Sequence, residues 1–515
     1  MNRKRKLLYN TTFGLIEQAI ALVCGFILPR LFLVTYGSAV NGLISTITRY
    51  LGLISLLDLG VGSVVQASMY KPLADNDTVQ LSKVFKSTVK FFRRLACIFI
   101  AYVIVLAFVF PLFIDKENDF FFSFSLVIIL SLGTLAQYMF GISYQKLLSA
   151  DQKGYISMSM SIISIIINTV LSVLLIELGA SIQVVKFVSA LVYILKPFVL
   201  FLYIKKNYKI DRKVVLTEEP IKQKWNGFSQ HISSVVCDNV DVVLLSFFST
   251  MENISVYSVY SMVTNGVQKI IMSAVSGLES LYGNLIAKNE KSKLLSTFVS
   301  VEWTVHFSVT IIYTIAAITI TPFVSVYTSD VTDVDYNVPL FGALLTIAYS
   351  VMCLRVPYFR LIKAAGHFKE TQNGAFVSAG LNVVVSFVFI FKFGLIGVAA
   401  GTFIALFYHT CYFAWYLRKN IINRPIKYFI KYLITDSLTG ALTYFVCRNF
   451  SMSDVSYPSW IKYAAEVSLT TIAIAVFLNI LLYFRIIKST LGLIISKNKK
   501  AKEIKNTEAL NRKES

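Results

Sequence analysis

Long apolar segments recur along almost the whole of this 515-residue chain, and they constrain its fold more than any other feature. Fourteen of them are long enough to cross the roughly 30 Å of hydrocarbon in a bilayer. They lie near residues 12–35, 40–69, 95–114, 120–143, 156–177, 184–204, 230–250, 254–286, 296–325, 338–359, 374–391, 395–417, 431–449 and 461–485. Because lipid offers no partner for an unpaired backbone group, each span must be a helix. We therefore expect an all-α polytopic membrane protein.

The composition agrees with this interpretation. Apolar residues make up 56% of the chain and charged residues only 15%, which is more apolar surface than a soluble protein of this size could bury. The six cysteines lie in apolar segments and indicate small buried side chains, with neither a disulfide framework nor metal-ligand spacing. The basic start MNRKRK precedes an apolar run that is too long for the h-region of a signal peptide. We expect that run to be retained as the first span.

The net charge of +21 is explained by topology. With the N-terminus in the cytoplasm, the predicted cytoplasmic segments hold 39 of the 49 lysines and arginines, and the external segments hold only four. The external loops are acidic instead, as in SDVTDVD over 329–335. The positive-inside rule therefore places both termini in the cytoplasm, and the charge gives no reason to expect a nucleic-acid partner. All external loops are short, so the chemistry should take place within the membrane.

An internal repeat divides the spans into two sets. Asn168 and Ser172 in the motif N-T-V-L-S match Asn382 and Ser386 in N-V-V-V-S, 214 residues later. Six crossings separate the halves, so an axis near the membrane normal should relate them around a central cavity, as in transporters with parallel repeats. The predicted parts are a six-helix bundle over 1–205, a cytoplasmic linker over 206–229, a second six-helix bundle over 230–417, two additional spans over 418–485 and a basic cytoplasmic tail over 486–515.

Six basic residues fall inside predicted spans. A charged side chain at the centre of a bilayer costs about 3 kcal/mol or more, so such residues usually face a polar cavity or a partner. Five are our candidates for a cationic substrate-binding cavity: Arg30, Arg49, Lys196, Lys269 and Arg355. The sixth, Lys186, lies near the end of its span, where a lysine can snorkel to the interface.

These candidates have a second interpretation. Arg30 could snorkel outward, and Arg49 could mark the interfacial end of a shorter span. The other three could each belong to a buried ion pair. Pro29 removes a backbone donor and should kink the first helix, and a bend there could gate the cavity.

Four acidic residues are candidates for coupling transport to Na⁺ or H⁺: Asp58, Asp238, Asp241 and Glu302. Asp238 and Asp241 lie three residues apart on one helix face, where two carboxylates repel and favour a shared proton or a bound cation. Pairing of these two acids with Lys269 or Arg355 is the alternative. Glu302 lies one turn before His306, and the two could form a proton relay or a core pair.

Several motifs are missing from the sequence. There is no G-x-x-x-x-G-K-[ST] for an ATPase, and the four histidines form no H-E-x-x-H or other ligand cluster. We therefore expect neither an enzyme nor a bound cofactor or metal.

Three stretches resemble the Wzx-type polysaccharide flippases of the multidrug/oligosaccharidyl-lipid/polysaccharide (MOP) exporter superfamily: VNGLISTITRYLGLISLLDLGVGSVVQASMYKPLA over 40–74, RVPYFRLIKAAGHFKETQ over 355–372 and FGLIGVAAGTFIAL over 393–406. The resemblance implies two six-helix bundles around a cavity that works by alternating access in a bacterial plasma membrane. It also implies an undecaprenyl-diphosphate-linked oligosaccharide as substrate for polysaccharide or capsule export. A polysaccharide polymerase and glycosyltransferases are then the expected partners, beside membrane lipids.

Other functions remain as alternatives. Lipid II flippases of the same superfamily also have two extra C-terminal helices, and a cation-coupled exporter of small molecules would share the fold. A membrane glycosyltransferase or polymerase usually needs a large catalytic loop or domain, which this chain lacks. A passive scaffold would not explain the repeat or the intramembrane charges.

Overall fold

The computed structural model describes residues 3–58, 61–115, 118–211, 214 and 228–511, and within them the regular elements are helical. They are α1 (Arg3–Gly52), the 3₁₀ turn η1 (Leu53–Asp58), α2 (Val61–Ala74), α3 (Thr78–Val109), the π-turn η2 (Phe110–Ile114), α4 (Phe120–Ala136), the π-turn η3 (Gln137–Gly141), α5 (Ile142–Ala150), α6 (Gly154–Glu177), α7 (Ile182–Asn207), α8 (Phe228–Phe248), α9 (Met251–Ala274), α10 (Leu278–Ala287), α11 (Lys291–Tyr327), α12 (Pro339–Leu354), α13 (Val356–Ala364), α14 (Gln372–Asn420), α15 (Lys427–Cys447) and α16 (Tyr457–Asn511). The all-α prediction is confirmed. Most of the predicted linker 206–229 lies outside the described residues.

Within the described residues, eleven helical stretches are long and apolar enough to cross a membrane. Two of them, α1 and α14, each cover two predicted spans, because a non-helical glycine breaks each helix. The span predicted over 431–449 falls on α15, which is not among the eleven. The chain is therefore a multi-pass membrane protein.

The first helix breaks at Gly37 and continues helically through Pro29, where we expected the kink. Gly37 has φ 83° and ψ 169°, a conformation that essentially only glycine adopts without strain. The span predicted over 40–69 is also interrupted. The α-helix gives way there to the 3₁₀ turn η1, at whose start the Ser55 hydroxyl donates to the Gly52 carbonyl at 2.7 Å.

The predicted repeat has a structural counterpart in two helical hairpins. In the first, α6 turns at Gly179 into α7, and Ser172 on α6 contacts Ser189 on α7 at 3.4 Å. In the second, α14 turns back on itself at Gly394, and the Ser386 hydroxyl donates to the Val398 carbonyl at 3.3 Å.

Small side chains let the two arms of α14 approach each other closely. A Cβ on Gly401 would lie 2.1 Å from the Ser386 hydroxyl oxygen and 2.6 Å from the Ser386 main-chain nitrogen. Glycine at this position is therefore required by packing.

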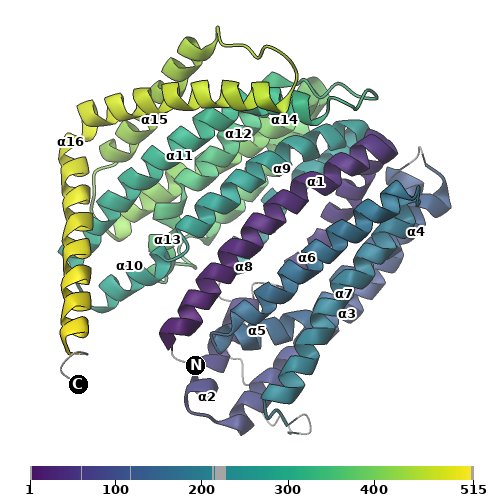
Figure 1. The fold of residues 1–515 in the computed structure, drawn as a ribbon, viewed down its shortest axis with the longest axis horizontal. Coiled ribbons are helices and arrows are strands. Elements are labelled where there is room, and N and C mark those ends of the chain that lie inside the picture. The colour runs from purple at the N-terminus through teal and green to yellow at the C-terminus, as the bar shows by residue number, and fades with distance from the viewer. Residues whose placement is uncertain (1–2, 59–60, 116–117, 212–213, 215–227, 512–515) are drawn as a thin grey trace. The chain divides into compact units, whose positions relative to one another are not determined.

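The described helices form two compact units. The first comprises Met1–Gly266, Tyr327–Phe341 and Phe368–Ala405, and the second comprises Val267–Val326, Gly342–His367 and Leu406–Ser515. In the first unit α1, α6, α7, α4 and α3 lie side by side (Figure 1). One hydrophobic core of this unit joins α2, α3, α5 and α7 through buried side chains such as Phe85, Tyr144 and Leu147, and partly buried residues of α6 pack against it.

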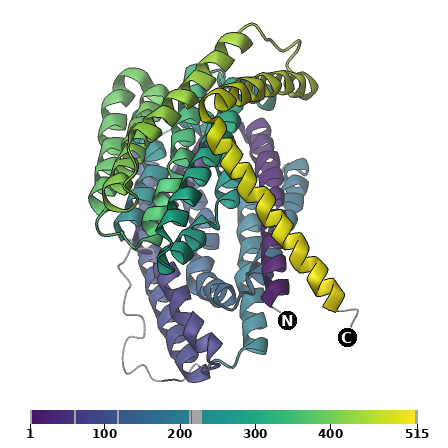
Figure 2. The same ribbon diagram turned by 90° about the vertical axis from the view of Figure 1, so that its left-hand side faces the viewer.

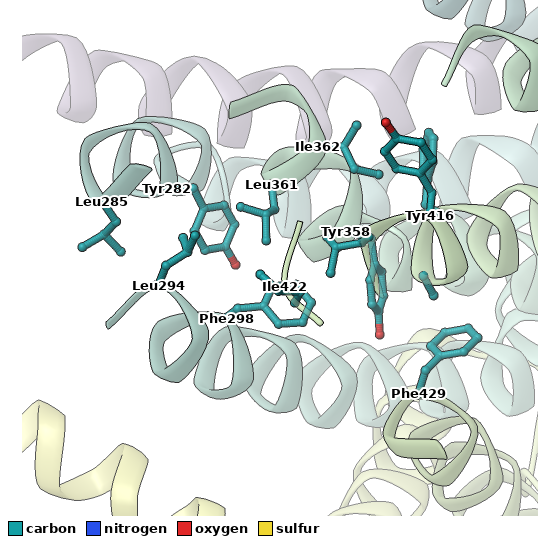
Figure 3. Packing of buried hydrophobic residues seen from close by; sticks show 13 residues of the cluster. Tyr282, Leu285, Leu294, Phe298, Tyr358, Leu361, Ile362, Tyr416, Ile422 and Phe429 are labelled. Carbon is teal, nitrogen blue, oxygen red and sulfur yellow. The ribbon is translucent and has the colours of Figure 1, made fainter. Parts of the chain in front are cut away.

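The second unit has an aromatic core that joins α10, α11, α13, α14 and α15. Figure 3 shows Tyr282, Phe298, Tyr358 and Phe429 packed against aliphatic neighbours in this core. The α16 helix packs on α15 and changes direction where Tyr483 leaves helical geometry, as its yellow ribbon shows (Figure 2).

Candidate functional site

Arg30 pairs with an acid of the loop between α11 and α12. Its Nη2 lies 2.9 Å from Asp330 Oδ2, and the Arg30 side chain keeps 31% of its surface exposed. From the sequence we expected Arg30 either to face a cavity or to snorkel to the interface. Neither interpretation included an ion pair with Asp330, which lies 300 residues away in the sequence. The acidic composition of the 329–335 loop was the signal that could have found it.

The same loop caps the helix that follows the break in α1. Asp333 accepts a hydrogen bond from the Ser38 main-chain N–H at 2.7 Å and another from the Ser38 hydroxyl at 2.7 Å. This is the role of an N-cap side chain, supplied here by a distant loop. The Tyr336 hydroxyl contacts both Ser38, at 2.7 Å, and Ser255, at 2.9 Å. We call this set of contacts, with Arg30–Asp330, the α1 clasp.

Arg49 lies near the end of α1 and reaches α8. Its Nη1 donates to the main-chain carbonyl of Asp238 at 2.8 Å. A carbonyl contact positions the guanidinium but does not neutralise its charge. The side chain of Asp58, another of the coupling candidates, lies outside the described residues.

Asp241 on α8 is buried, with 2% of its surface exposed. Its Oδ2 accepts hydrogen bonds from the Tyr257 hydroxyl at 2.9 Å and the Thr402 hydroxyl at 2.7 Å. Both donors are hydroxyl groups. The alternative interpretation of the sequence had paired this acid with Lys269 or Arg355 instead. Asp238, one turn earlier on α8, is exposed and contacts Ser234 at 3.5 Å, so the two acids lie in different environments.

A buried amide completes this polar cluster. Asn382 is fully buried, and its Nδ2 donates to the Thr402 hydroxyl at 3.0 Å. The Oδ1 atoms of both Asp241 and Asn382 are buried and have no hydrogen-bond partner among the described residues. Because buried polar atoms are nearly always satisfied, two orphan oxygens in one cluster need an explanation. Carboxylate, amide and hydroxyl oxygens are the ligands that a hard cation prefers, and a proton on Asp241 would also supply a donor.

The sequence reading missed Thr402 and Tyr257 as parts of this cluster. Asn382 was noticed only as a mark of the repeat, with no role assigned. Its spacing of four from Ser378 and Ser386 was the available signal, because it places three polar side chains on one face of an apolar helix.

The other three basic candidates have different surroundings. Lys196 on α7 donates to the Ser161 hydroxyl on α6 at 2.6 Å. Lys269 is exposed and forms no ion pair with any residue that the structure describes. Arg355 Nη1 lies 2.8 Å from Nδ1 of His409, which must be unprotonated there to accept the hydrogen bond.

The five basic candidates are divided between the two units. Arg30, Arg49 and Lys196 belong to the first unit, and Lys269 and Arg355 belong to the second. Their convergence on one chamber stays a prediction.

Glu302, the last coupling candidate, lies in the second unit with 1% of its side chain exposed. It forms an ion pair with Arg424 and accepts a hydrogen bond from the Tyr358 hydroxyl at 2.7 Å. The hydrogen bonds of His306 go to Asp436 and Tyr358. Tyr358 bridges the two residues, because its hydroxyl also lies 3.3 Å from His306 Nε2.

Comparisons with known proteins identify the fold. No protein-family model and no curated protein sequence matches the chain. Among solved structures, the lipid II flippase MurJ in an inward closed conformation matches 93% of this chain and 100% of its own, with a TM-score of 0.70 and 17% identity. An outward-facing multidrug resistance MATE family transporter of the MOP superfamily matches 81% of this chain and 95% of its own, with a TM-score of 0.58 and 14% identity.

A third neighbour is a MOP superfamily transporter from Pyrococcus furiosus, which matches 82% of this chain and 98% of its own, with a TM-score of 0.58 and 13% identity. These likenesses show that the chain has the MOP-type transporter fold. The neighbours are flippases and transporters, not enzymes.

Proposed function

We propose that this protein is a cation-coupled flippase that carries an undecaprenyl-diphosphate-linked oligosaccharide across a bacterial plasma membrane by alternating access. The observation that carries the proposal is the presence of arginines inside the spans of a chain with the MOP fold. A diphosphate bears about two negative charges, and guanidinium groups bind phosphate oxygens bidentately.

Arg30 supplies a way to couple substrate binding to movement of α1. It forms an ion pair with Asp330, whose carboxylate is exposed, so a diphosphate can compete with Asp330 for the same guanidinium. Loss of that ion pair weakens the α1 clasp and leaves Asp333 and Tyr336 as its remaining contacts. Arg49 would hold a second phosphate oxygen, because its hydrogen bond goes to a neutral main-chain carbonyl, with which a phosphate oxygen can compete.

The polar cluster around Asp241 is the proposed coupling site. A bound Na⁺ would take the two orphan oxygens as ligands, and a proton would neutralise the carboxylate. Either ion would join α8, which carries Asp241, to the α14 hairpin, which carries Asn382 and Thr402. The cluster lies within the first unit, so its occupancy would change the packing of that unit directly.

Two related functions remain candidates. The MurJ likeness favours lipid II as the lipid-linked substrate, since that structure covers more of this chain than the MATE transporters do. The MATE likeness favours a small-molecule exporter. A polysaccharide polymerase and glycosyltransferases remain proposed partners of the first function.

A reconstituted flipping assay tests the proposal. Proteoliposomes receive undecaprenyl diphosphate that carries a fluorescent oligosaccharide, lipid II or a cationic drug, and the rate of transfer is measured with and without a Na⁺ or H⁺ gradient. Arg30→Ala and Arg49→Ala should each slow transfer of the lipid-linked substrate about 10- to 100-fold, which corresponds to loss of a charged hydrogen bond. Asp241→Asn should abolish the response to the gradient.

Lys392→Ala is the matched control, because it removes an exposed positive charge near the Gly394 turn. It should transfer substrate at the wild-type rate. Unchanged transfer in both arginine variants would refute the substrate site, and transport of the drug alone would favour the exporter.

A further inference from the structure

Arg49 of the proposed substrate site and Asp241 of the proposed ion site meet within one turn of α8. Arg49 Nη1 donates to the main-chain carbonyl of Asp238 at 2.8 Å, and Asp241 follows three residues later on the same helix. Residues three apart lie on one helix face, with about 5–6 Å between their Cβ atoms. The guanidinium that would bind a diphosphate is therefore close to the carboxylate that would bind a cation.

The end of α1 is fixed to α8 on both sides of this contact. The Tyr50 hydroxyl lies 3.0 Å from the Ser246 hydroxyl, and both residues are buried. His231 Nε2 lies 2.7 Å from the main-chain oxygen of Ser55. Because Ser246 and His231 lie on either side of Asp238 along α8, the backbone at Arg49 stays beside this turn even when its side chain changes partner.

Two charged side chains act electrostatically on the Asp241 carboxylate, the positive Arg49 and the negative Asp238. The hydrogen-bond donors to Asp241 are the neutral hydroxyls of Tyr257 and Thr402. Unit charges about 6–10 Å apart, at an effective dielectric constant of about 20, change an equilibrium constant by roughly 15- to 100-fold. Arg49 is thus the basic side chain on which a change in the charge of Asp241 acts.

We propose that Arg49 couples the two sites, because a cation bound at Asp241 frees its guanidinium for the diphosphate. The inference rests on the proposed function. When Asp241 is ionised, its carboxylate attracts Arg49 toward α8 and competes with the phosphate oxygens. When a cation neutralises Asp241, that attraction is lost, and a phosphate oxygen takes Arg49 from the Asp238 carbonyl more easily.

The coupling acts in both directions. A change in the affinity of one ligand that is caused by a second ligand must be matched by an equal change in the affinity of the second. A bound diphosphate should therefore raise the affinity of Asp241 for its cation by the factor that the cation gives the diphosphate. The coupling is positive, since one ligand is an anion and the other a cation.

A double-mutant cycle on the purified full-length protein tests the proposal without depending on which cation binds. Affinity for undecaprenyl diphosphate in detergent is measured by microscale thermophoresis at about pH 8, far above the ordinary pKa of a carboxyl group, with choline in place of Na⁺. Asp241→Asn removes the charge as a bound cation would, and it should tighten binding about 10-fold or more. In Arg49→Gln protein the same change should alter the affinity by less than about 2-fold.

The choice of glutamine separates charge from structure. Its amide can still donate to the Asp238 carbonyl, so a purely structural role of Arg49 would leave the effect of Asp241→Asn at its wild-type size. Arg30→Ala is the matched control, because Arg30 is another arginine of α1 but pairs with Asp330. It should weaken binding and keep the full effect of Asp241→Asn.

An effect of Asp241→Asn that is equal in the wild-type and Arg49→Gln backgrounds would overturn the proposal, and so would an affinity that Asp241→Asn does not change. Both results leave the proposed function standing. Wild-type protein that does not bind undecaprenyl diphosphate would overturn the proposed function and this inference together.

If Asp241→Asn does not fold, saturating Na⁺ and, separately, a pH of about 6 replace the substitution as ways to neutralise Asp241. At least one of them should tighten binding more in wild type than in Arg49→Gln, which corrects for titration of the diphosphate itself. Equal responses of the two proteins to both treatments would refute the coupling.

Discussion

At the scale of single residues, Asp151 connects three segments of the first unit. Its carboxylate lies 3.0 Å from Lys6 Nζ on α1 and 2.7 Å from Lys153 Nζ, and it accepts from the Tyr208 hydroxyl at 2.5 Å, at the end of α7. Burial raises the pKa of Asp151, but the hydrogen bonds from Lys153, Tyr208 and Lys6 together lower it by more, so the net pKa lies below its ordinary value. Burial and the bond to Asp151 raise the pKa of Tyr208.

The depressed pKa sets the pH range of this stabilisation. A carboxyl whose pKa is lower in the folded state stabilises the fold fully above its unfolded pKa of about 3.9, and this contribution is lost as the pH falls through the folded value. Asp151→Asn should lower the free energy of unfolding by about 1–2 kcal/mol at neutral pH and by almost nothing in strong acid. Thermal unfolding in detergent across a pH series measures the difference.

Asp75→Asn provides the control, because Asp75 is exposed. It should unfold like wild type at each pH. An Asp151→Asn deficit that stays constant down to strong acid would show that the carboxylate charge is not the cause.

At the scale of elements, α1 meets α9 at a point where no side chain fits. A Cβ on Gly42 would lie 1.8 Å from the Met251 carbonyl oxygen, whereas a Cβ on Gly25 of the same helix would meet nothing within 4 Å. Gly42→Ala must separate the two backbones and should destabilise the protein by about 3 kcal/mol or more. Gly25→Ala should be neutral or stabilising by about 0.5–1 kcal/mol, because alanine favours a helix.

Thermal unfolding of the two glycine variants, side by side, measures this contrast. Equal unfolding temperatures would show that α1 and α9 do not approach as closely as the structure describes.

At the scale of the whole molecule, the charge distribution predicts which ends of the helices face the cytoplasm. Ser329 and Lys288 are exposed residues in the loops at the two ends of α11. In a variant without the six native cysteines, Ser329→Cys should react with an impermeant thiol reagent in intact cells, and Lys288→Cys should react only after permeabilisation. The opposite labelling would reverse the predicted orientation.

The positions of the helices could be predicted from the sequence, but most contacts between them could not. The apolar segments predicted where helices lie, since the helices of the structure cover all fourteen of them, with α1 and α14 each taking two and the second span interrupted beyond Gly52. A kink in α1 was expected at Pro29, whereas the helix breaks at Gly37, where an acceptor from a distant loop caps the helix that follows. Among the site residues, Asp241 was selected because it lies three residues from Asp238 on one helix face. In the structure Asp241 is buried and Asp238 is exposed, so the two acids have different environments.

The sequence alone determined the class of the protein, because length, hydropathy and the need to bond every backbone group within lipid are local properties. It also determined the repeat, since Asn168 and Asn382 lie in matching motifs. Only the tertiary structure decided which groups meet: Asp330 beside Arg30, and Thr402, 161 residues away, beside Asp241. Such contacts depend on how separate helices pack, and the periodicity of one helix carries no information about the polar groups of another.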